Sequence, residues 1–87
     1  TVFELLQNTP NPFESYTNIS FRLPVASAAT FTIYDVTGKV HRVVSIQGQK
    51  GLNTVTLSKS ELNGTGMFYY QLDAEKYSAT KRMFVVQ

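Results

Sequence analysis

The chain has 87 residues, 43% of them hydrophobic and 13% aromatic, which suits one small domain with enough apolar side chains for a folded core. It has no cysteine, so disulfides and thiolate metal sites are excluded. Its 8 basic and 6 acidic residues give a net charge of +2 and are scattered, unlike the clustered Lys and Arg of a nucleic-acid-binding face. No apolar run approaches the roughly 18 residues that a membrane-spanning helix needs.

The chain begins with a short apolar segment and a proline-rich connector. Residues 1–6 are mostly apolar and predict a first edge strand. Residues 7–13 contain two prolines, which fix φ and remove backbone donors, so this stretch is predicted to be an extended connector outside any sheet interior. We expect Phe13 to anchor the connector in the core.

Two alternating strands and a turn follow. Residues 17–23 and 29–34 alternate apolar and polar side chains, as antiparallel strands with one buried face do. Their inward sets are Ile19, Phe21 and Leu23, and then Ala29, Phe31 and Ile33. Asp35 and Gly38 predict a type I turn, with the aspartate capping it and the glycine accepting a positive φ. The returning strand, residues 39–46, breaks its alternation at Val43 and Val44, which predicts a bulge or a strand covered on both sides.

The second half of the chain repeats the strand pattern. Residues 52–57 form another strand, and Ser58 with Glu61 fits the capping box of a single helical turn, after which Leu62 is expected to close the open end of the sheets. A glycine-rich turn then starts a strand over residues 66–72, and residues 77–86 give a last strand that ends in four apolar residues. Most domains leave their last residues loose, so we predict that this tail is built into the core.

The pattern predicts about seven short strands and no helix longer than one turn. Short strands at spacings near ten residues are typical of an antiparallel β-sandwich of the immunoglobulin-like kind, although the Cys and Trp hallmarks of true immunoglobulin domains are absent. We therefore predict an all-β, immunoglobulin-like sandwich that forms a single domain over residues 1–87. Its predicted shared core is Phe21, Phe31, Ile33, Val55, Phe68, Tyr70 and Leu72.

Catalytic chemistry is not visible. His41 is the only histidine, and a lone histidine in a strand is usually a surface residue rather than a base or a ligand. The acidic residues show no metal-ligand spacing, and no nucleophile elbow or phosphate-binding glycine loop occurs. The sequence therefore predicts no enzyme, no metal and no cofactor.

Two groups of surface residues leave alternatives open. The tyrosines at 16, 34, 69 and 77 are ordinary strand residues or an exposed platform for sugar. Lys76, Lys81 and Arg82 flank the last hairpin, where they either discourage edge-to-edge aggregation or contact a receptor.

Four motifs, in order, carry a resemblance to a known family. They are Asn8-Thr9-Pro10-Asn11-Pro12-Phe13, Ile33-Tyr34-Asp35-Val36-Thr37-Gly38-Lys39-Val40, Gly66-Met67-Phe68-Tyr69-Tyr70-Gln71-Leu72 and Thr80-Lys81-Arg82-Met83-Phe84-Val85-Val86. Together they resemble the type A C-terminal sorting domain of the bacterial type IX secretion system, found in secreted proteins of Bacteroidetes. Thr9 and Phe68 depart from the family's aromatic and tyrosine at those positions, and the second change argues against a tyrosine corner.

The resemblance implies a function as well as a fold. Such domains cross the periplasm, are recognised by the outer-membrane translocon, and carry an upstream cargo to the cell surface or the medium before a sortase-type peptidase removes them. We therefore expect a monomeric fragment of a larger secreted protein that binds no nucleic acid and inserts in no membrane. The alternative is a fibronectin-like or carbohydrate-binding accessory module. The expected recognition residues are Pro10, Asn11, Pro12, Phe13, Asp35, Gly38, Gly66, Phe68, Tyr70, Lys81, Arg82, Val85 and Val86.

Overall fold

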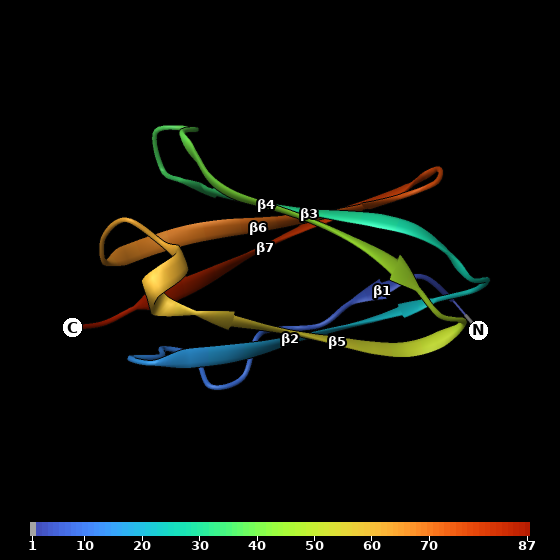
Figure 1. Ribbon diagram of the computed structural model, residues 1–87, viewed down its shortest axis with the longest axis horizontal. Coiled ribbons are helices and arrows are strands. Elements are labelled where there is room, and N and C mark those ends of the chain that lie inside the picture. Colours follow the sequence, from blue (N-terminus) through green and yellow to red (C-terminus); the bar gives the residue numbers. More distant parts are fainter. Residues whose placement is uncertain (1) are drawn as a thin grey trace.

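Two antiparallel sheets pack face to face in the computed structural model, which describes residues 2–87 (Figure 1). The three-stranded sheet has the order β1 (Glu4–Leu5), β2 (Tyr16–Leu23), β5 (Gly51–Ser58). The four-stranded sheet has the order β4 (Val40–Gly48), β3 (Ser27–Asp35), β6 (Gly66–Ala74), β7 (Tyr77–Val85). A single 3-10 turn, η1 (Lys59–Glu61), follows β5. The predicted all-β sandwich of about seven strands is confirmed.

The core lies between the sheets and is formed by the inward-facing side chains of the central strands, which alternate with outward-facing ones. Strand β3 pairs with β6 so that Phe31 lies opposite Leu72 and Ile33 opposite Tyr70. Phe21 of the other sheet meets Phe31 edge to face, with ring centroids 5.3 Å apart. Such aromatic contacts add to the free energy gained by burial. Within residues 2–87, no helix has the length and hydropathy needed to cross a membrane.

The predicted core is confirmed except at Val55, which is only half-buried and packs against the core from its margin. It lies on β5, which among the strands of residues 2–87 pairs with β2 alone and so forms one edge of its sheet. Leu57, two residues later on the same face, is the fully buried member of this strand. Leu62 closes the end of the sheets as expected, with 6% of its surface exposed.

Strand β4 contains a bulge, but it lies earlier in the strand than the sequence predicts. Ile33 pairs with Arg42 and Tyr34 with Val40, so His41 is the extra residue of a bulge. After this bulge the normal alternation resumes: Val44 packs against the core, while Val43 is 56% exposed on the outer face. The expected bulge at Val43 and Val44 is therefore wrong in position, because Val43 is an exposed apolar residue and not a sign of altered backbone.

Between β3 and β4 the predicted turn forms as expected. The Gly38 amide donates to the Asp35 carbonyl at 3.0 Å, and Gly38 has a φ of 90°, a conformation that glycine adopts at no steric cost. Figure 1 shows this turn, η1 and the C-terminal end at the same end of the sandwich.

Candidate functional site

The proline-rich connector lies against the outer edge of β7. The Phe13 amide donates to the Phe84 carbonyl at 3.0 Å, and the Val86 amide donates to the Phe13 carbonyl at 2.9 Å, which makes a short parallel bridge between Phe13 and Val85. Phe13 is 1% exposed, so its predicted role as the anchor is confirmed. The first and last motifs of the sequence therefore form one structural unit.

The side-chain amides of Gln7 and Asn11 form further hydrogen bonds with the outer edge of β7. The Gln7 Nε2 donates to the Arg82 carbonyl at 2.6 Å, and the Phe84 amide donates to the Asn11 Oδ1 at 3.0 Å. An edge strand presents unpaired backbone donors and acceptors, and here side chains stand in for a neighbouring strand. Both X–Pro peptide bonds in this connector are cis.

Tyr70 holds the start of the connector on the core through hydrogen bonds of its hydroxyl. Its hydroxyl donates to the Leu6 carbonyl and accepts from the Asn8 amide, both at 2.9 Å, and its side chain is fully buried. Burial raises the pKa of Tyr70 to about 12, because the phenolate form would lose its hydration. The sequence argued against a tyrosine corner because of Phe68, but a hydroxyl tie exists after all, two residues further along the strand.

Two buried polar residues under the connector were missed. The Asn8 Nδ2 donates to the Thr17 hydroxyl at 3.0 Å and to the Pro10 carbonyl at 3.2 Å, and the Thr17 hydroxyl donates to the same carbonyl at 2.9 Å. They are 3% and 0% exposed. Thr17 shares the inward phase of Ile19, so the alternation of its strand was a usable signal. Asn8 carries no such signal.

A cavity of about 350 Å³ opens beside the part of β7 that the connector covers. Its lining is Gln7, Asn11, Thr80, Lys81, Arg82 and Phe84. The lining contains two cations and no carboxylate, and neither Lys81 nor Arg82 forms an ion pair with another residue of the range 2–87. The cavity is therefore rich in hydrogen-bond donors and positively charged.

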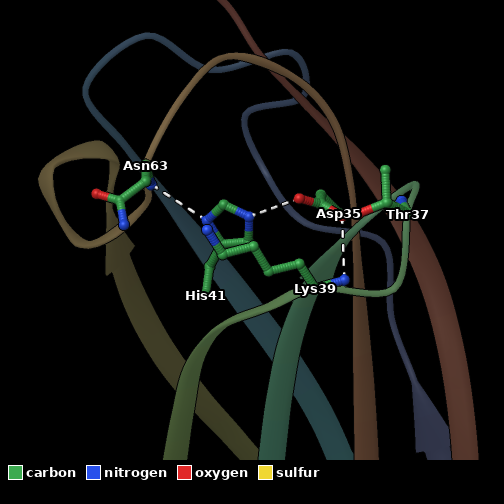
Figure 2. Close-up of polar contacts among 5 residues, drawn as sticks. All are labelled: Asp35, Thr37, Lys39, His41 and Asn63. Atoms are coloured by element: carbon green, nitrogen blue, oxygen red, sulfur yellow. Dashed lines mark hydrogen bonds and ion pairs between the residues drawn. The ribbon is translucent and has the colours of Figure 1, made fainter.

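A second polar cluster closes the end of the sandwich where β3 turns into β4 (Figure 2). The His41 ring lies between the Asp35 carboxylate, 2.8 Å from Nε2, and the Asn63 amide, which donates to Nδ1 at 3.4 Å. The hydrogen bond from the Thr37 hydroxyl, followed by that of His41, holds the pKa of Asp35 well below its ordinary 3.8.

His41 is not the surface residue that the sequence predicted. Its side chain is 4% exposed and meets the Phe68 ring edge to face at 5.0 Å. The bulge in β4 explains the error, because the extra residue turns its side chain over the end of the core instead of outward. The histidine therefore links the turn after β3, the loop after η1 and the core.

The predicted recognition residues divide into three classes by exposure. Four are buried in the core: Phe13, Phe68, Tyr70 and Val85. Three shape turns or strand ends: Asp35, Gly38 and Gly66. The remaining six carry exposed or half-exposed side chains: Pro10, Asn11, Pro12, Lys81, Arg82 and Val86. The last class offers exposed side chains to a partner, and Gly38 and Gly66 of the second class are also exposed.

Strand register brings several of the turn residues and buried residues together at one end of the four-stranded sheet. Gly66 pairs with Val85, and Phe68 lies between Asp35 of β3 and Met83 of β7. The turn motif, the glycine-rich motif and the C-terminal strand are thus neighbours in the four-stranded sheet.

Neither metal binding nor a sugar platform finds support in this arrangement. Among residues 2–87, no group of three or more His, Cys, Asp or Glu could hold a metal ion. Tyr34 and Tyr69 stack on each other at 5.5 Å on the outer face of the four-stranded sheet, whereas Tyr77 stacks on Phe3. Tyr16 lies on the other sheet. The four tyrosines do not share one surface.

Comparisons with known proteins identify one family. The family model described as "Secretion system C-terminal sorting domain" matches residues 9–87. No curated protein matches the chain. Among solved structures, the crystal structure of a β-glucosidase from Listeria innocua superposes at a TM-score of 0.49 and 14% identity. That alignment covers 97% of this chain and 16% of the β-glucosidase chain.

Proposed function

Because the chain belongs to the family of secretion system C-terminal sorting domains, we propose that it is read as a folded signal by the type IX machinery. A type IX sorting domain directs export of its protein to the cell surface or the extracellular space. One observation supports recognition of the folded domain by the machinery. Phe13 of the connector bonds to Phe84 and Val86, and so joins the connector to the outer edge of β7; this part of the molecule is called the joined edge. A chain that lacks either end cannot form this edge, so a receptor that contacts it selects finished domains.

The finer steps of the proposal concern partners and route. Residues 1–87 act as one monomeric sorting domain attached to an upstream cargo. The domain folds in the periplasm, the outer-membrane translocon binds it, and a sortase-type peptidase then separates it from the cargo. In these steps the domain is a ligand and not a catalyst, since sorting domains are not a catalytic family and the single histidine is engaged with Asp35 and Phe68.

The exposed class of recognition residues makes the direct contacts in this proposal. Asn11, Lys81 and Arg82 line the cavity beside the joined edge, where two cations offer charge to a partner. The buried class contributes indirectly, because Phe13, Tyr70 and Val85 hold that edge in shape. An accessory module for sugar binding is not favoured, since the tyrosines that it needs lie on different surfaces.

Export of a fused cargo tests the proposal. The cargo-domain fusion is expressed in a host with the type IX machinery, and cargo is measured in the medium and in the periplasm. We expect the parent fusion to be exported, and deletion of residues 80–87 to trap cargo in the periplasm because it removes most of β7. Normal export of the deleted fusion would overturn the proposal.

A matched substitution separates folding from recognition. Lys81→Ser with Arg82→Ser removes two charges whose loss costs little stability, since surface changes usually shift the free energy of unfolding by under about 0.5 kcal/mol. We expect this variant to keep its melting temperature and to lose export. Full export together with an unchanged melting temperature would remove these side chains from the recognition surface.

A further inference from the structure

Within residues 2–87, no strand other than β6 is hydrogen-bonded to β7, although β1 of the other sheet lies close to β7 and Phe3, just before β1, stacks on Tyr77. Strand β7 pairs with β6 without a register shift, and alternate residues of an antiparallel strand point their backbone groups to opposite sides. Both backbone groups of Phe84 point toward the connector, so those of Arg82, Thr80 and Ser78 also point away from β6.

The connector covers only the last part of this edge. The Gln7 side chain donates a hydrogen bond to the Arg82 carbonyl. The connector makes no backbone hydrogen bond with residues 77–81, nearer the start of β7. Ser78 and Thr80 are exposed, and their outward amides and carbonyls, like the Arg82 amide, have no hydrogen-bond partner among residues 2–87. The edge therefore offers a run of backbone donors and acceptors at which an extended peptide can pair.

The chemistry beside this free edge selects the kind of peptide. Thr80, Lys81 and Arg82 line the cavity of about 350 Å³, so the cavity adjoins the free backbone groups and is lined by two residues without an ion-pair partner in the range 2–87. Asn11 uses its Oδ1 on the Phe84 amide, which leaves its Nδ2 as a further donor. A surplus of donors and positive charge complements a carboxylate, whose oxygens only accept.

We propose that an extended acidic segment of the secretion machinery pairs as an additional strand with β7 at residues 78–82. One of its Asp or Glu side chains enters the cavity that Lys81 and Arg82 line. The identity of the partner rests on the function proposed above, whereas the binding mode rests on the free edge and the cavity. The added strand continues the four-stranded sheet beyond β7 and ends where Gln7 blocks the edge.

A protective role for the same charges makes the opposite prediction. Lys and Arg on an edge strand discourage pairing with other chains, including a second copy of this one. If Lys81 and Arg82 only protect the edge, the parent chain binds no strand, and removing the charges produces dimers or larger species. If they recognise an acidic strand, removing them abolishes binding and leaves a monomer.

Synthetic peptides test the binding mode on the 87-residue chain. The probe is a blocked decapeptide that alternates valine or threonine with glutamate, and its controls carry glutamine or lysine in place of glutamate. We expect the glutamate peptide to shift the amide resonances of Thr80 and Arg82 and to slow their hydrogen exchange. The glutamine peptide is expected to bind about tenfold more weakly, and salt at about 0.5 M is expected to weaken the glutamate peptide.

Two variants address the backbone and the charges separately. Thr80→Pro removes an amide that points away from β6, so the internal ladder of the sheet keeps its bonds while pairing at the edge is blocked. Lys81→Ser with Arg82→Ser removes the carboxylate partners and leaves the edge free. The matched control is Lys39→Ser with Lys50→Ser, which removes the same charge from exposed positions outside β7.

We expect both β7 variants to bind the glutamate peptide at least about tenfold more weakly and the Lys39 and Lys50 control to match the parent. Sedimentation of each variant reports self-association. The inference is overturned by equal binding of the glutamate and glutamine peptides, by amide protection outside residues 78–82, by a Lys81 and Arg82 variant that dimerises, or by a folded Thr80→Pro variant that binds as the parent does.

The export assay separates this inference from the proposed function. If the parent fusion is exported and the folded Thr80→Pro fusion is retained, both stand. If both fusions are exported equally, the strand-pairing inference fails and the sorting function stands. If the parent fusion itself is retained in a competent host, the sorting function fails, whatever the peptides show.

Discussion

Tyr70 combines the two properties that a tyrosine offers, a large apolar ring and a hydroxyl that needs partners once it is buried. The ring lies in the core opposite Ile33, and the hydroxyl bonds to Leu6 and Asn8. A phenylalanine would fill the same space without holding the connector. Tyr70 therefore joins the core of the sandwich to the start of the connector, as Phe13 does at its end.

Tyr70→Phe is expected to lower the free energy of unfolding by roughly 1–3 kcal/mol at neutral pH, because it leaves the Asn8 amide and the Leu6 carbonyl without their partner. Denaturant unfolding at pH 7 measures this loss. An unchanged midpoint would mean that water replaces the hydroxyl at no cost.

The same residue predicts an alkaline limit to stability. The pKa of Tyr70 is about 12 in the folded chain against 10.0 ordinarily, so above pH 10 the unfolded chain loses this proton more readily than the folded one. Its contribution is fully present below pH 10 and is lost as the pH rises toward 12. Unfolding midpoints between pH 9 and 12 should therefore fall more steeply for the parent than for Tyr70→Phe, and parallel curves would contradict the shift.

The lowered pKa of Asp35 predicts that the folded chain also loses stability in acid. The Thr37 hydroxyl, and then His41, hold its pKa below the ordinary 3.8. Its contribution is present above pH 3.8 and is lost as the pH falls below that value, because the unfolded chain then takes up the proton first. Asp35→Asn should flatten this acid limb of the stability curve, while Glu14→Gln, at an exposed position, should leave it as in the parent. Identical acid limbs in all three proteins would contradict the role assigned to Asp35.

At the scale of elements, the connector and β7 behave as one unit although they stand at opposite ends of the sequence. The connector substitutes for an edge neighbour along residues 82–86, and β7 in turn holds the connector on the core. An edge left bare here would be a site for aggregation. The cavity is lined by Gln7 and Asn11 of the connector and by residues of β7.

Phe13→Ala tests this coupling. Removing a fully buried phenylalanine costs roughly 3–5 kcal/mol, and here the loss should fall first on the connector. Hydrogen exchange of the amides at positions 13, 84 and 86 should accelerate more than exchange in the pairs between β3 and β6. Glu14→Ala, the exposed neighbour, serves as the control. Uniform acceleration throughout the sheet would show that the connector and the core open together.

At the scale of the whole molecule, an 87-residue sandwich without disulfides has a narrow stability margin. The edge that we propose for recognition is assembled from residues 7–13 and 82–86, so we expect any loss of global stability to remove the signal as well. Export should therefore follow the folded population and not merely the presence of the motifs.

Phe68→Ala is expected to cost roughly 3–5 kcal/mol, because Phe68 is 2% exposed and also supports the His41 ring. Every exposed residue that we propose for recognition remains in this variant. We expect its melting temperature to fall sharply and its fused cargo to stay in the periplasm, with the milder Phe68→Leu intermediate in both measurements. Export of an unfolded Phe68→Ala domain would show that the machinery reads the linear motifs alone.

The sequence by itself determined the fold class, most of the core and the family. Period-two alternation marks which face of a strand is buried, and this local signal placed Phe21, Phe31 and Leu72 correctly. Turn residues such as Gly38 act through their own φ, and they too could be read locally. The resemblance to sorting domains followed from motifs that stand in order along the chain.

Only the tertiary structure decided which side chains meet across long separations. The Tyr70 hydroxyl finds its partners 62 and 64 residues away, and the Asn11 side chain finds the Phe84 amide at a separation of 73. No local pattern encodes such contacts, because they depend on how the two sheets are stacked and which edge the connector crosses. The bulge that turns His41 inward and the depth of Val55 at the sheet margin are consequences of strand pairing for the same reason.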